Sequence, residues 1–573
     1  MSYQASTTDD PSIASRTTGG SSGESSTASR IDSRDAFRIG GPGQLPMWPV
    51  ETGPPSMTDP SLSSAAVDIS ISHLQLVEIP FDKVLFASRY TRENDPTEAD
   101  ETLLIYASFE GNRDRLISVL DTLLQILYEL GHRGRVEIVD PRAASGIKTF
   151  APVLSSKQRE EWDSTLGYII EVLRRIGAEW RQIMPANRGY WAEVSVLTVM
   201  IKATDTIFRQ PEIVQLWNEL SEKGYSVEFV STNGLWGLFG DLHTTINDEQ
   251  VRASLQWPFE PTFHGMGLSV GRVSTKTSGV SSTVGGYLRI RKGNEEEAVG
   301  LGCYHGFRLE EDGTSDPNLE SMGSTDLCWP CQSPSPGDIS LFSELLRSTA
   351  SRSVSENLPI PLKQKRHLER EDALTKLETI RSFDPYIGNI VAVSGWRNRE
   401  LGSGHGAPLV FLDWACIAIS PRHCPHPLNS IEDMRLQLLR YRPEGVEHWK
   451  TEKAMVDTFA PLPVGDTVVF KQGRTTGLTA GTLGGLVPAA HRIEGLPAGL
   501  HHRGFVVFSP PFRSSFSEAG DSGSWCLNGD GDLVGQIVAG DSRDGSAILI
   551  PISVIVKDIE RALKLPAGSV TLP

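Results

Sequence analysis

The sequence has few cysteines, no long apolar run and no excess of basic residues. Six cysteines in 573 residues are too few for a disulfide scaffold. No apolar run approaches the roughly 20 residues that span a bilayer, and residues 1–8 lack the positive and apolar parts of a secretion signal. The formal charge is −17, from 54 Lys and Arg against 71 Asp and Glu, with no basic patch of any length. These absences exclude a secreted mini-protein, a membrane span and a histone-like nucleic-acid binder, and we expect an intracellular, cytoplasmic protein.

The composition changes twice along the chain, and at roughly 100–200 residues per domain the length predicts two to four folding units. Residues 1–70 are rich in Ser, Thr, Gly and Pro, which predicts a disordered tail. Residues 71–260 mix short apolar runs with helical periodicity, which predicts an α/β domain to which no role can be assigned. The expected strands are 102–107, 136–139 and 225–230, and the expected helices are 113–130, 162–176, 191–208 and one that begins at Pro211.

Residues 261–573 are mainly β-rich. Short apolar runs separated by glycine are typical of a sandwich or barrel. An insertion at 308–385 contains a loop rich in Ser and Pro and a charged helix at 362–380, and residues 553–563 predict a C-terminal helix. The expected strands are 285–291, 298–304, 387–394, 409–419, 467–471, 504–508, 533–539 and 547–550.

The segment Gly520-Asp521-Ser522-Gly523-Ser524-Trp525 carries the strongest chemical signal. A nucleophilic serine needs an exposed Oγ on a tight turn, with backbone N–H groups directed at a developing oxyanion. Glycines on both sides allow such a turn without a Cβ clash. The alternative is an ordinary glycine-rich β-turn.

Two further segments accompany this loop. Residues 469–482 read VFKQGRTTGLTAGT, and residues 533–540 read LVGQIVAG. In this order and spacing, the three segments resemble the chymotrypsin-like serine peptidases, and residues 469–482 are most similar to the α-lytic and streptogrisin branch. The resemblance covers about 310 residues and implies a double β-barrel with a triad in the chain order His, Asp, Ser.

The resemblance also indicates where the other two triad members stand. Asp413 precedes the apolar run 414–419, as the family's aspartate does, and a buried carboxylate needs a partner such as a histidine N–H. The alternative for Asp413 is a cap at the end of a strand. His305, in the run 298–307, matches the family's strand followed by Ala-x-His, with Cys303 in the place of the small residue. The competitor His405 lies only eight residues before Asp413, so we expect it in a surface turn.

By this resemblance, His305 is the general base, Asp413 orients it, and the N–H groups of Gly520 and Ser522 form the oxyanion hole. The substrate-binding residues are then Phe516, Val538, Ala539 and Gly540. Phe516 stands where an acid selects Lys or Arg in trypsin-like members, and Glu518 lies nearby, so the cleavage preference stays open. We therefore predict a serine endopeptidase acting on a protein or peptide, with no metal, no cofactor, and neither nucleic acid nor a membrane as partner. The alternative is a catalytically inactive peptidase-fold module with an interaction role.

Two departures from the family pattern bear on activation and location. In zymogens of the family, a freed N-terminus pairs with the aspartate before the serine, which is Asp521 here. Either this chain is cleaved near 260–285 or Asp521 has an internal partner, and we favour the internal partner. The disulfide beside the histidine is also missing, because Gly306 and Phe307 stand where its cysteine is expected. This agrees with a reducing compartment.

Weaker motifs lie elsewhere in the chain. Cys328 and Cys331 have the spacing of a zinc or redox pair, and His423, Cys424 and His426 offer further ligands, which leaves a zinc- or redox-dependent scaffold as a third hypothesis. The alternative is a loop with two free thiols. The basic run 363–367 predicts a solvated helix start, with nuclear import as the other interpretation. Nothing in the sequence indicates the oligomeric state.

Overall fold

The structure, a computed structural model, divides into two compact units, residues 1–147 and 148–573. None of the helices in the described part of the chain has the length and apolar character needed to cross a bilayer. The described residues are 38–41, 50–53, 60–91, 100–109, 111–129, 131, 135–141, 148–189, 192, 195–203, 211–231, 259, 265–273, 281–307, 328–352, 359–395, 397–400, 409–421, 429–441, 445–461, 466–484, 488–492, 502–510, 515–541 and 544–573.

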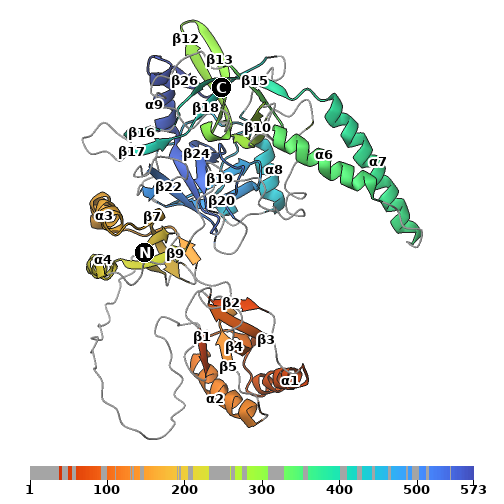
Figure 1. The fold of residues 1–573 in the computed structure, drawn as a ribbon, viewed down its shortest axis with the longest axis vertical. Coiled ribbons are helices and arrows are strands. Elements are labelled where there is room, and N and C mark those ends of the chain that lie inside the picture. Colours follow the sequence, from red (N-terminus) through yellow and green to blue (C-terminus); the bar gives the residue numbers. More distant parts are fainter. Residues whose placement is uncertain are drawn as a thin grey trace. The chain divides into compact units, whose positions relative to one another are not determined.

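The first unit is a five-stranded sheet with two helices (Figure 1). The strand order is β1-β5-β4-β3-β2, and α2 connects the parallel pair β4 and β5. Buried leucines and isoleucines of β4 and α2 form its core. Within the predicted tail, residues 1–37 lie outside the described set. The elements β1, β2 and the start of α1 differ from the disorder predicted for this segment. Ile39 of β1 and Ala66 of α1 join this core. The elements are β1 (Arg38–Gly41), β2 (Val50–Gly53), α1 (Pro60–Leu76), β3 (Phe81–Thr91), β4 (Asp100–Ala107), α2 (Arg113–Glu129) and β5 (Arg135–Val139).

The start of the second unit has the same arrangement as the first. Its order β6-α3-β7-β8-α4-β9 matches β2-α1-β3-β4-α2-β5 element by element. In both copies the first two strand pairings are antiparallel and the third is parallel. Both hairpins also have a register shift at the start of their first strand. The elements of the second copy are β6 (Lys148–Phe150), α3 (Ser156–Arg175), β7 (Trp180–Gly189), β8 (Val196–Ala203), α4 (Pro211–Glu222) and β9 (Ser226–Ser231).

One ion pair occupies the same place in both copies. Arg89 on β3 donates to both carboxylate oxygens of Glu137 on β5, at 3.0 and 2.7 Å. Arg188 on β7 does the same to Glu228 on β9, at 2.7 Å for each bond. The matching order, pairing and ion pair make these segments an internal structural repeat. We call residues 50–139 repeat 1 and residues 148–231 repeat 2.

The helix predicted at 191–208 is wrong, because Val196–Ala203 form strand β8. This run is rich in β-branched and large apolar side chains, which pack well in a strand buried on both sides. It pairs with β7 along one edge and β9 along the other, and residues 199–203 are buried. The other expected helices and strands of this region are present within a few residues, apart from the first six of α3, which the prediction missed.

Six strands near the C-terminus close into an antiparallel barrel. Their order is β20-β19-β23-β24-β25-β22, and β22 pairs back to β20. We call this the closed barrel. Its strands are β19 (Thr467–Gly473), β20 (Gly477–Leu483), β22 (His502–Phe508), β23 (Trp525–Leu527), β24 (Leu533–Gly540) and β25 (Ala547–Pro551).

An eight-stranded antiparallel sheet precedes the closed barrel in the chain, except for its last strand β26, which follows it. Its order is β11-β10-β14-β15-β18-β13-β12-β26, and we call it the half-barrel. The hairpin β16–β17 forms a separate small sheet. The strands are β10 (Leu268–Arg272), β11 (Ser282–Val284), β12 (Gly286–Lys292), β13 (Glu295–Gly302), β14 (Trp329–Gln332), β15 (Tyr386–Val393), β16 (Arg397–Glu400), β17 (Leu409–Leu412), β18 (Ala415–Ile419) and β26 (Val570–Thr571).

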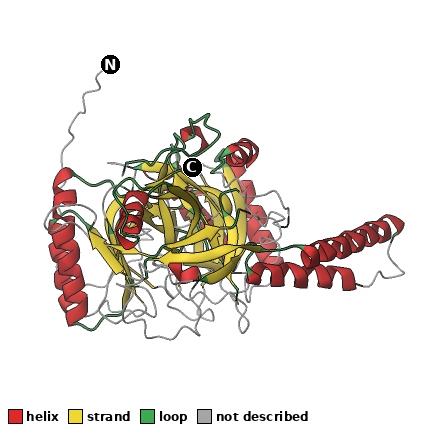
Figure 2. Cartoon of the chain, turned by 90° about the horizontal axis from the view of Figure 1, so that it is seen from above, coloured by secondary structure: helices red, strands yellow, loops and turns green. Residues whose placement is uncertain are grey.

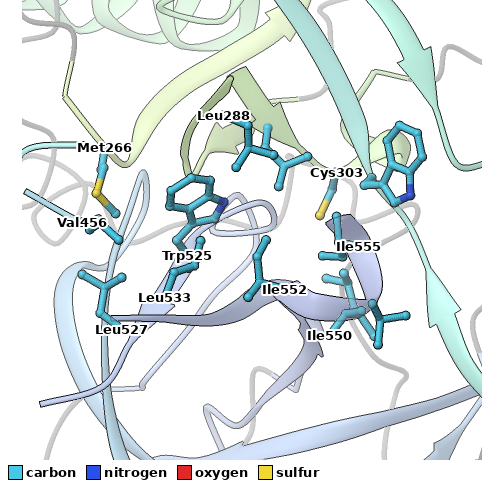
Figure 3. Close-up of a cluster of buried hydrophobic side chains, with 14 of the residues drawn as sticks. Met266, Leu288, Cys303, Val456, Trp525, Leu527, Leu533, Ile550, Ile552 and Ile555 are labelled. Atoms are coloured by element: carbon cyan, nitrogen blue, oxygen red, sulfur yellow. The ribbon is translucent and has the colours of Figure 1, made fainter. Parts of the chain in front are cut away.

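The half-barrel and the closed barrel share one hydrophobic core (Figure 3). Leu288 from the half-barrel, Leu527 and Leu533 from the closed barrel, and Ile552 and Ile555 from the C-terminal helix α9 (Ile552–Ala562) all belong to it. This confirms the predicted mainly-β double barrel and its C-terminal helix. Helix α8 (Glu432–Tyr441) packs its Met434 and Leu438 into the same core.

The predicted insertion contributes both to the half-barrel and to a helical projection. Its strand β14 pairs with β10 and β15. Helices α6 (Pro336–Ser351) and α7 (Ile360–Ser382) lie side by side and extend away from the strands (Figures 1 and 2). Helix α7 matches the predicted charged helix, whereas α6 occupies part of the segment predicted as a loop.

Repeat 2 is joined to the closed barrel by backbone pairing. Strand β21 (Ala489–His491) pairs with β22 on one side and with β7 on the other. The sheet of repeat 2 is therefore continuous with the barrel, and the indole N–H of Trp162 on α3 also donates to the carbonyl of Pro488 at 3.0 Å. The boundary between the two compact units therefore lies between residues 147 and 148. This position falls inside the segment 71–260 that was predicted as one domain.

Candidate active site

His305 and Asp413 meet at the junction of two strand ends in the half-barrel. His305 lies in the short helix η4 (Tyr304–Gly306) just after β13, and Asp413 lies between β17 and β18. The Asp413 carboxylate accepts the backbone N–H of His305 at 2.9 Å and faces Nδ1 of its ring at 2.5 Å. Both side chains are buried. Because the carboxylate accepts Nδ1–H, Nε2 is the ring nitrogen left free to accept a proton.

Ser522 lies on the loop before β23, and its backbone is fixed by the half-barrel. Its carbonyl accepts the N–H of Thr283 and the hydroxyl of Ser282, each at 2.8 Å. Its own Oγ faces the carbonyl of Val538 at 3.4 Å. In the described part of the chain no hydrogen bond joins Ser522 Oγ to the His305 ring. In unliganded sites such a bond is often long and tightens only when substrate binds.

Two glycines of this loop have left-handed backbone conformations. Gly520 has φ +96° and Gly523 has φ +99°, in the region that favours glycine. A Cβ on Gly523 would also lie 2.0 Å from the Thr283 carbonyl oxygen, so no larger residue fits there. The glycines on both sides of Ser522 therefore allow the turn that the sequence predicted.

Some backbone N–H groups of the loop that carries Ser522 donate hydrogen bonds within the described part of the chain, and others do not. Those of Asp521, Gly523 and Ser524 donate to backbone carbonyls at 2.8–3.0 Å. Those of Gly520 and Ser522 donate to no acceptor among the residues that the structure describes. Gly520 is half-buried and Ser522 is buried. Backbone N–H groups without a partner in the folded chain are the kind of donor that an oxyanion hole needs.

Asp521 is held by an internal cation, as expected from the sequence. Its Oδ2 lies 3.0 Å from Nζ of Lys471 on β19, and both side chains are fully buried. It also accepts the N–H groups of Thr475, Thr476 and Glu518. Burial would raise the pKa of Asp521, but the Lys471 charge and the hydrogen bonds from the Thr476 hydroxyl and the Glu518 N–H more than offset it and hold the pKa below its usual value. The loop thus has its stabilising cation within the folded chain.

A closed barrel and a half-barrel share one core, with a buried His–Asp pair contributed by the half-barrel and a Gly-Asp-Ser-Gly loop by the closed barrel. The fold is that of a chymotrypsin-like serine peptidase. Position 306, where the sequence lacks the family's cysteine, also has no room for one, because a Cβ there would lie 2.4 Å from the Cβ of Ser282.

Comparison with solved structures finds serine proteases of low sequence identity. A glutamic acid-specific serine protease, described as using a histidine triad in substrate binding, is 12% identical, with 54% of this chain and all of that chain covered and a TM-score of 0.24. Protease A of Thermobifida fusca is 14% identical, with 52% and 95% covered and a TM-score of 0.25. The chymotrypsin of Cellulomonas bogoriensis is 18% identical, with 33% and 90% covered and a TM-score of 0.19. No family model and no curated protein matches the sequence.

The predicted substrate-binding residues fall into two groups. Val538, Ala539 and Gly540 form the buried end of β24, and β23 pairs with this strand only up to Gln536. Their edge on that side has no partner strand among the described residues. Phe516 is also buried, but in a core cluster of the closed barrel with Val507 and Phe505. Its ring fills the barrel interior, which differs from the cleft position expected of it.

The described residues contain one group of possible metal ligands, formed by Cys303, His305 and Asp413, whose donor atoms lie within 4.8 Å of one another. Burial and the nearby Asp413 charge raise the pKa of the Cys303 thiol well above its usual value. The thiol donates to the Ile537 carbonyl at 3.2 Å. In this structure the Cys303 thiol is thus buried and hydrogen-bonded to β24.

The two cysteines of the predicted zinc or redox pair, Cys328 and Cys331, lie in different environments. Cys331 is buried in β14, where burial raises the pKa of its thiol to about 12, whereas Cys328 is exposed. The other proposed ligands, His423, Cys424 and His426, and the competing histidine His405 lie outside the described residues.

The sequence did not predict one buried ion pair, which lies beside the loop that carries Ser522. Asp338, in the first turn of α6, accepts Nε of Arg474 at 2.7 and 2.9 Å and also binds its Nη2. A Cβ at Gly520 would lie 2.4 Å from Nη1 of the same arginine. The projecting helix α6 therefore contacts the loop through Arg474. The two residues are 136 positions apart, and no local pattern joins them.

Proposed function

We propose that the protein is a serine endopeptidase that hydrolyses peptide bonds through an acyl-enzyme intermediate. The observation that carries this proposal is the buried His305–Asp413 pair, together with the N–H groups of Gly520 and Ser522, which find no acceptor among the described residues. A module that only binds a partner has no need of this combination.

The residues would act in the order that the triad mechanism requires. His305 Nε2 takes the proton from Ser522 Oγ as the oxygen attacks the carbonyl carbon of the scissile bond. The Gly520 and Ser522 N–H groups hold the oxyanion, and loss of one such donor typically costs about 2.7–4 kcal/mol of transition-state stabilisation. His305 then protonates the leaving amine, and water repeats the sequence on the acyl-enzyme. Asp413 stabilises the imidazolium that forms in both steps.

The class of substrate follows from the strand edge beside Ser522. An extended peptide can add as a further antiparallel strand to the edge of Val538–Gly540 that has no partner strand among the described residues, which would place its carbonyl groups in a row next to the serine. This supports an internal stretch of protein or peptide as the substrate. The cysteines of the described residues are all free thiols, which supports the cytoplasm as the place of action.

The second candidate is a catalytically inactive module with the peptidase fold. It is favoured by one observation, that Ser522 Oγ faces the Val538 carbonyl at 3.4 Å rather than the imidazole. An inactive protein would keep the loop for its shape alone.

Labelling with a fluorophosphonate probe separates the two candidates. We expect the wild-type protein to be labelled and Ser522→Ala to lose the label while it keeps its melting temperature. Ser524→Ala, which removes a second buried hydroxyl from the same loop, is the matched control and should keep the label. Equal labelling of wild type and Ser522→Ala, or no labelling of folded wild type, would overturn the proposal.

A further inference from the structure

A buried lysine connects repeat 2 to the turn that follows the proposed substrate edge, Val538–Gly540. Lys202 lies on β8, and its side chain is 2% exposed. Its Nζ donates to Asp541 Oδ2 at 2.8 Å and to Asp544 Oδ2 at 2.7 Å. Burial would lower the pKa of Lys202, but the two carboxylates more than offset this and raise it, so the lysine is charged at neutral pH. Two carboxylates from the barrel thus hold one cation from the repeat.

The same turn adjoins the proposed substrate edge and also contacts the segment that leads to Ser522. Asp541 directly follows Val538–Gly540 on β24. The N–H of Gly545 donates to the Asp541 carbonyl at 2.8 Å, and the carbonyl of Gly545 accepts the N–H of Ser517 at 3.2 Å. Ser517 leads into the loop that carries Ser522. The turn therefore continues directly from the substrate edge, whereas it reaches the loop that carries Ser522 through the intervening Ser517.

The repeat provides an internal comparison for this lysine. The register of β8 against β9 places Lys202 opposite Val230, and the register of β4 against β5 places Tyr106 opposite Val139 at the matching position of repeat 1. The Arg–Glu pair is present in both repeats, whereas the lysine is present only in the repeat whose sheet continues into the barrel. The lysine is therefore tied to the contact with the barrel and is not required by the fold of the repeat.

We propose that Lys202 is a positioning residue for substrate binding, through which repeat 2 holds Asp541, Asp544 and the adjoining Val538–Gly540 edge in place. This inference rests on the proposed peptidase function. It predicts that repeat 2 contributes to substrate binding, because the position of the strand edge that binds an extended peptide depends on Lys202, which lies outside the barrels.

The test is a comparison of kinetic constants in the full-length protein. The substrate is the hexapeptide that wild type cleaves fastest in a quenched-fluorescent library. Loss of the cation displaces the edge, so we expect Lys202→Met to raise KM about 10-fold or more, since small displacements of positioning groups have effects of this order. The kcat and the rate of fluorophosphonate labelling should stay within about threefold of wild type, because the small probe does not use the strand edge.

Three further variants keep the test decisive. Lys202→Arg retains the charge and should restore most of the affinity. The triple variant Lys202→Met/Asp541→Asn/Asp544→Asn removes the unpaired carboxylates, so it should fold even if the single variant does not, and it should still show the raised KM. Glu228→Gln breaks the Arg188 pair within the same repeat but does not touch the turn, and its KM should equal that of wild type.

The outcomes separate this inference from the proposed function. An active wild type whose folded Lys202→Met or triple variant keeps the wild-type KM overturns this inference alone. So does a folded variant in which KM, kcat and labelling change together, because a general structural role would do that. A folded wild type that neither labels nor cleaves overturns the peptidase proposal and this inference with it.

Discussion

Lys471 and Asp521 form an ion pair in which both side chains are inaccessible to solvent, with Nζ and Oδ2 3.0 Å apart. The pair lies directly behind the loop that carries Ser522, because Asp521 is the preceding residue. Its geometry leads to the first prediction.

Lys471→Met should destabilise the protein by about 3–5 kcal/mol, because it leaves the Asp521 carboxylate buried without a counter-charge. Urea unfolding of the two proteins measures the difference. The double variant Lys471→Met/Asp521→Asn removes both charges and should recover part of the loss. A single variant as stable as wild type would contradict the role given to this pair.

The same pair predicts a loss of stability in acid. The folded-state pKa of Asp521 is lowered, so the stability that its ionised form contributes is present above its unfolded pKa, which is about 3.9. That contribution is lost as the pH falls through the lower pKa of the folded state. Unfolding free energies measured between pH 7 and pH 2 should therefore decrease less for Asp521→Asn than for wild type. Parallel curves would show that Asp521 is not the group responsible.

Asp413→Asn should lower kcat strongly while the fold is retained. An amide at this position can donate to Nδ1 and so favours the tautomer that leaves Nε2 protonated, and in a related triad this change costs about 10⁴-fold in kcat. Peptide hydrolysis under saturating substrate measures the effect, and circular dichroism checks the fold. A variant with wild-type kcat would remove Asp413 from the mechanism.

Asp338→Asn tests whether helix α6 supports the oxyanion loop. The change weakens the buried pair with Arg474, whose guanidinium packs against Gly520. We expect kcat to fall by about 10-fold with KM nearly unchanged, since the N–H donors act mainly in the transition state. Asp372→Asn on α7, which breaks an exposed pair with Lys376, is the matched control. An equal effect of both variants would contradict a specific role for Asp338.

The parts of the site that the sequence predicted are those with short-range patterns. Ser522 is enclosed by glycines whose backbone angles an ordinary residue rarely adopts, and Asp413 is a lone charge at the start of an apolar strand. Both signals are local, so both residues could be identified before the fold was known. The expected internal partner of Asp521 could be inferred only as a class, and the structure identifies it as Lys471.

The parts that the sequence did not predict depend on distant pairing. Lys202 and Asp541 are 339 positions apart, and no periodicity relates a lysine in one strand to a turn so far along the chain. Repeat 1 and repeat 2 share their Arg–Glu pair but little else in sequence. Their similarity therefore becomes visible in the order and register of their strands. Strand β8 was mistaken for a helix because a short apolar run is ambiguous until its neighbours are known.

The origin of the positive charge behind the nucleophile loop has a consequence for control in the cell. A side-chain ammonium is present as soon as β19 has folded, so the ion pair behind the loop that carries Ser522 forms without a cut in the backbone. On the proposed function, activity would then not depend on proteolytic processing, and control of the protein would depend on access of substrate or on the binding of a partner.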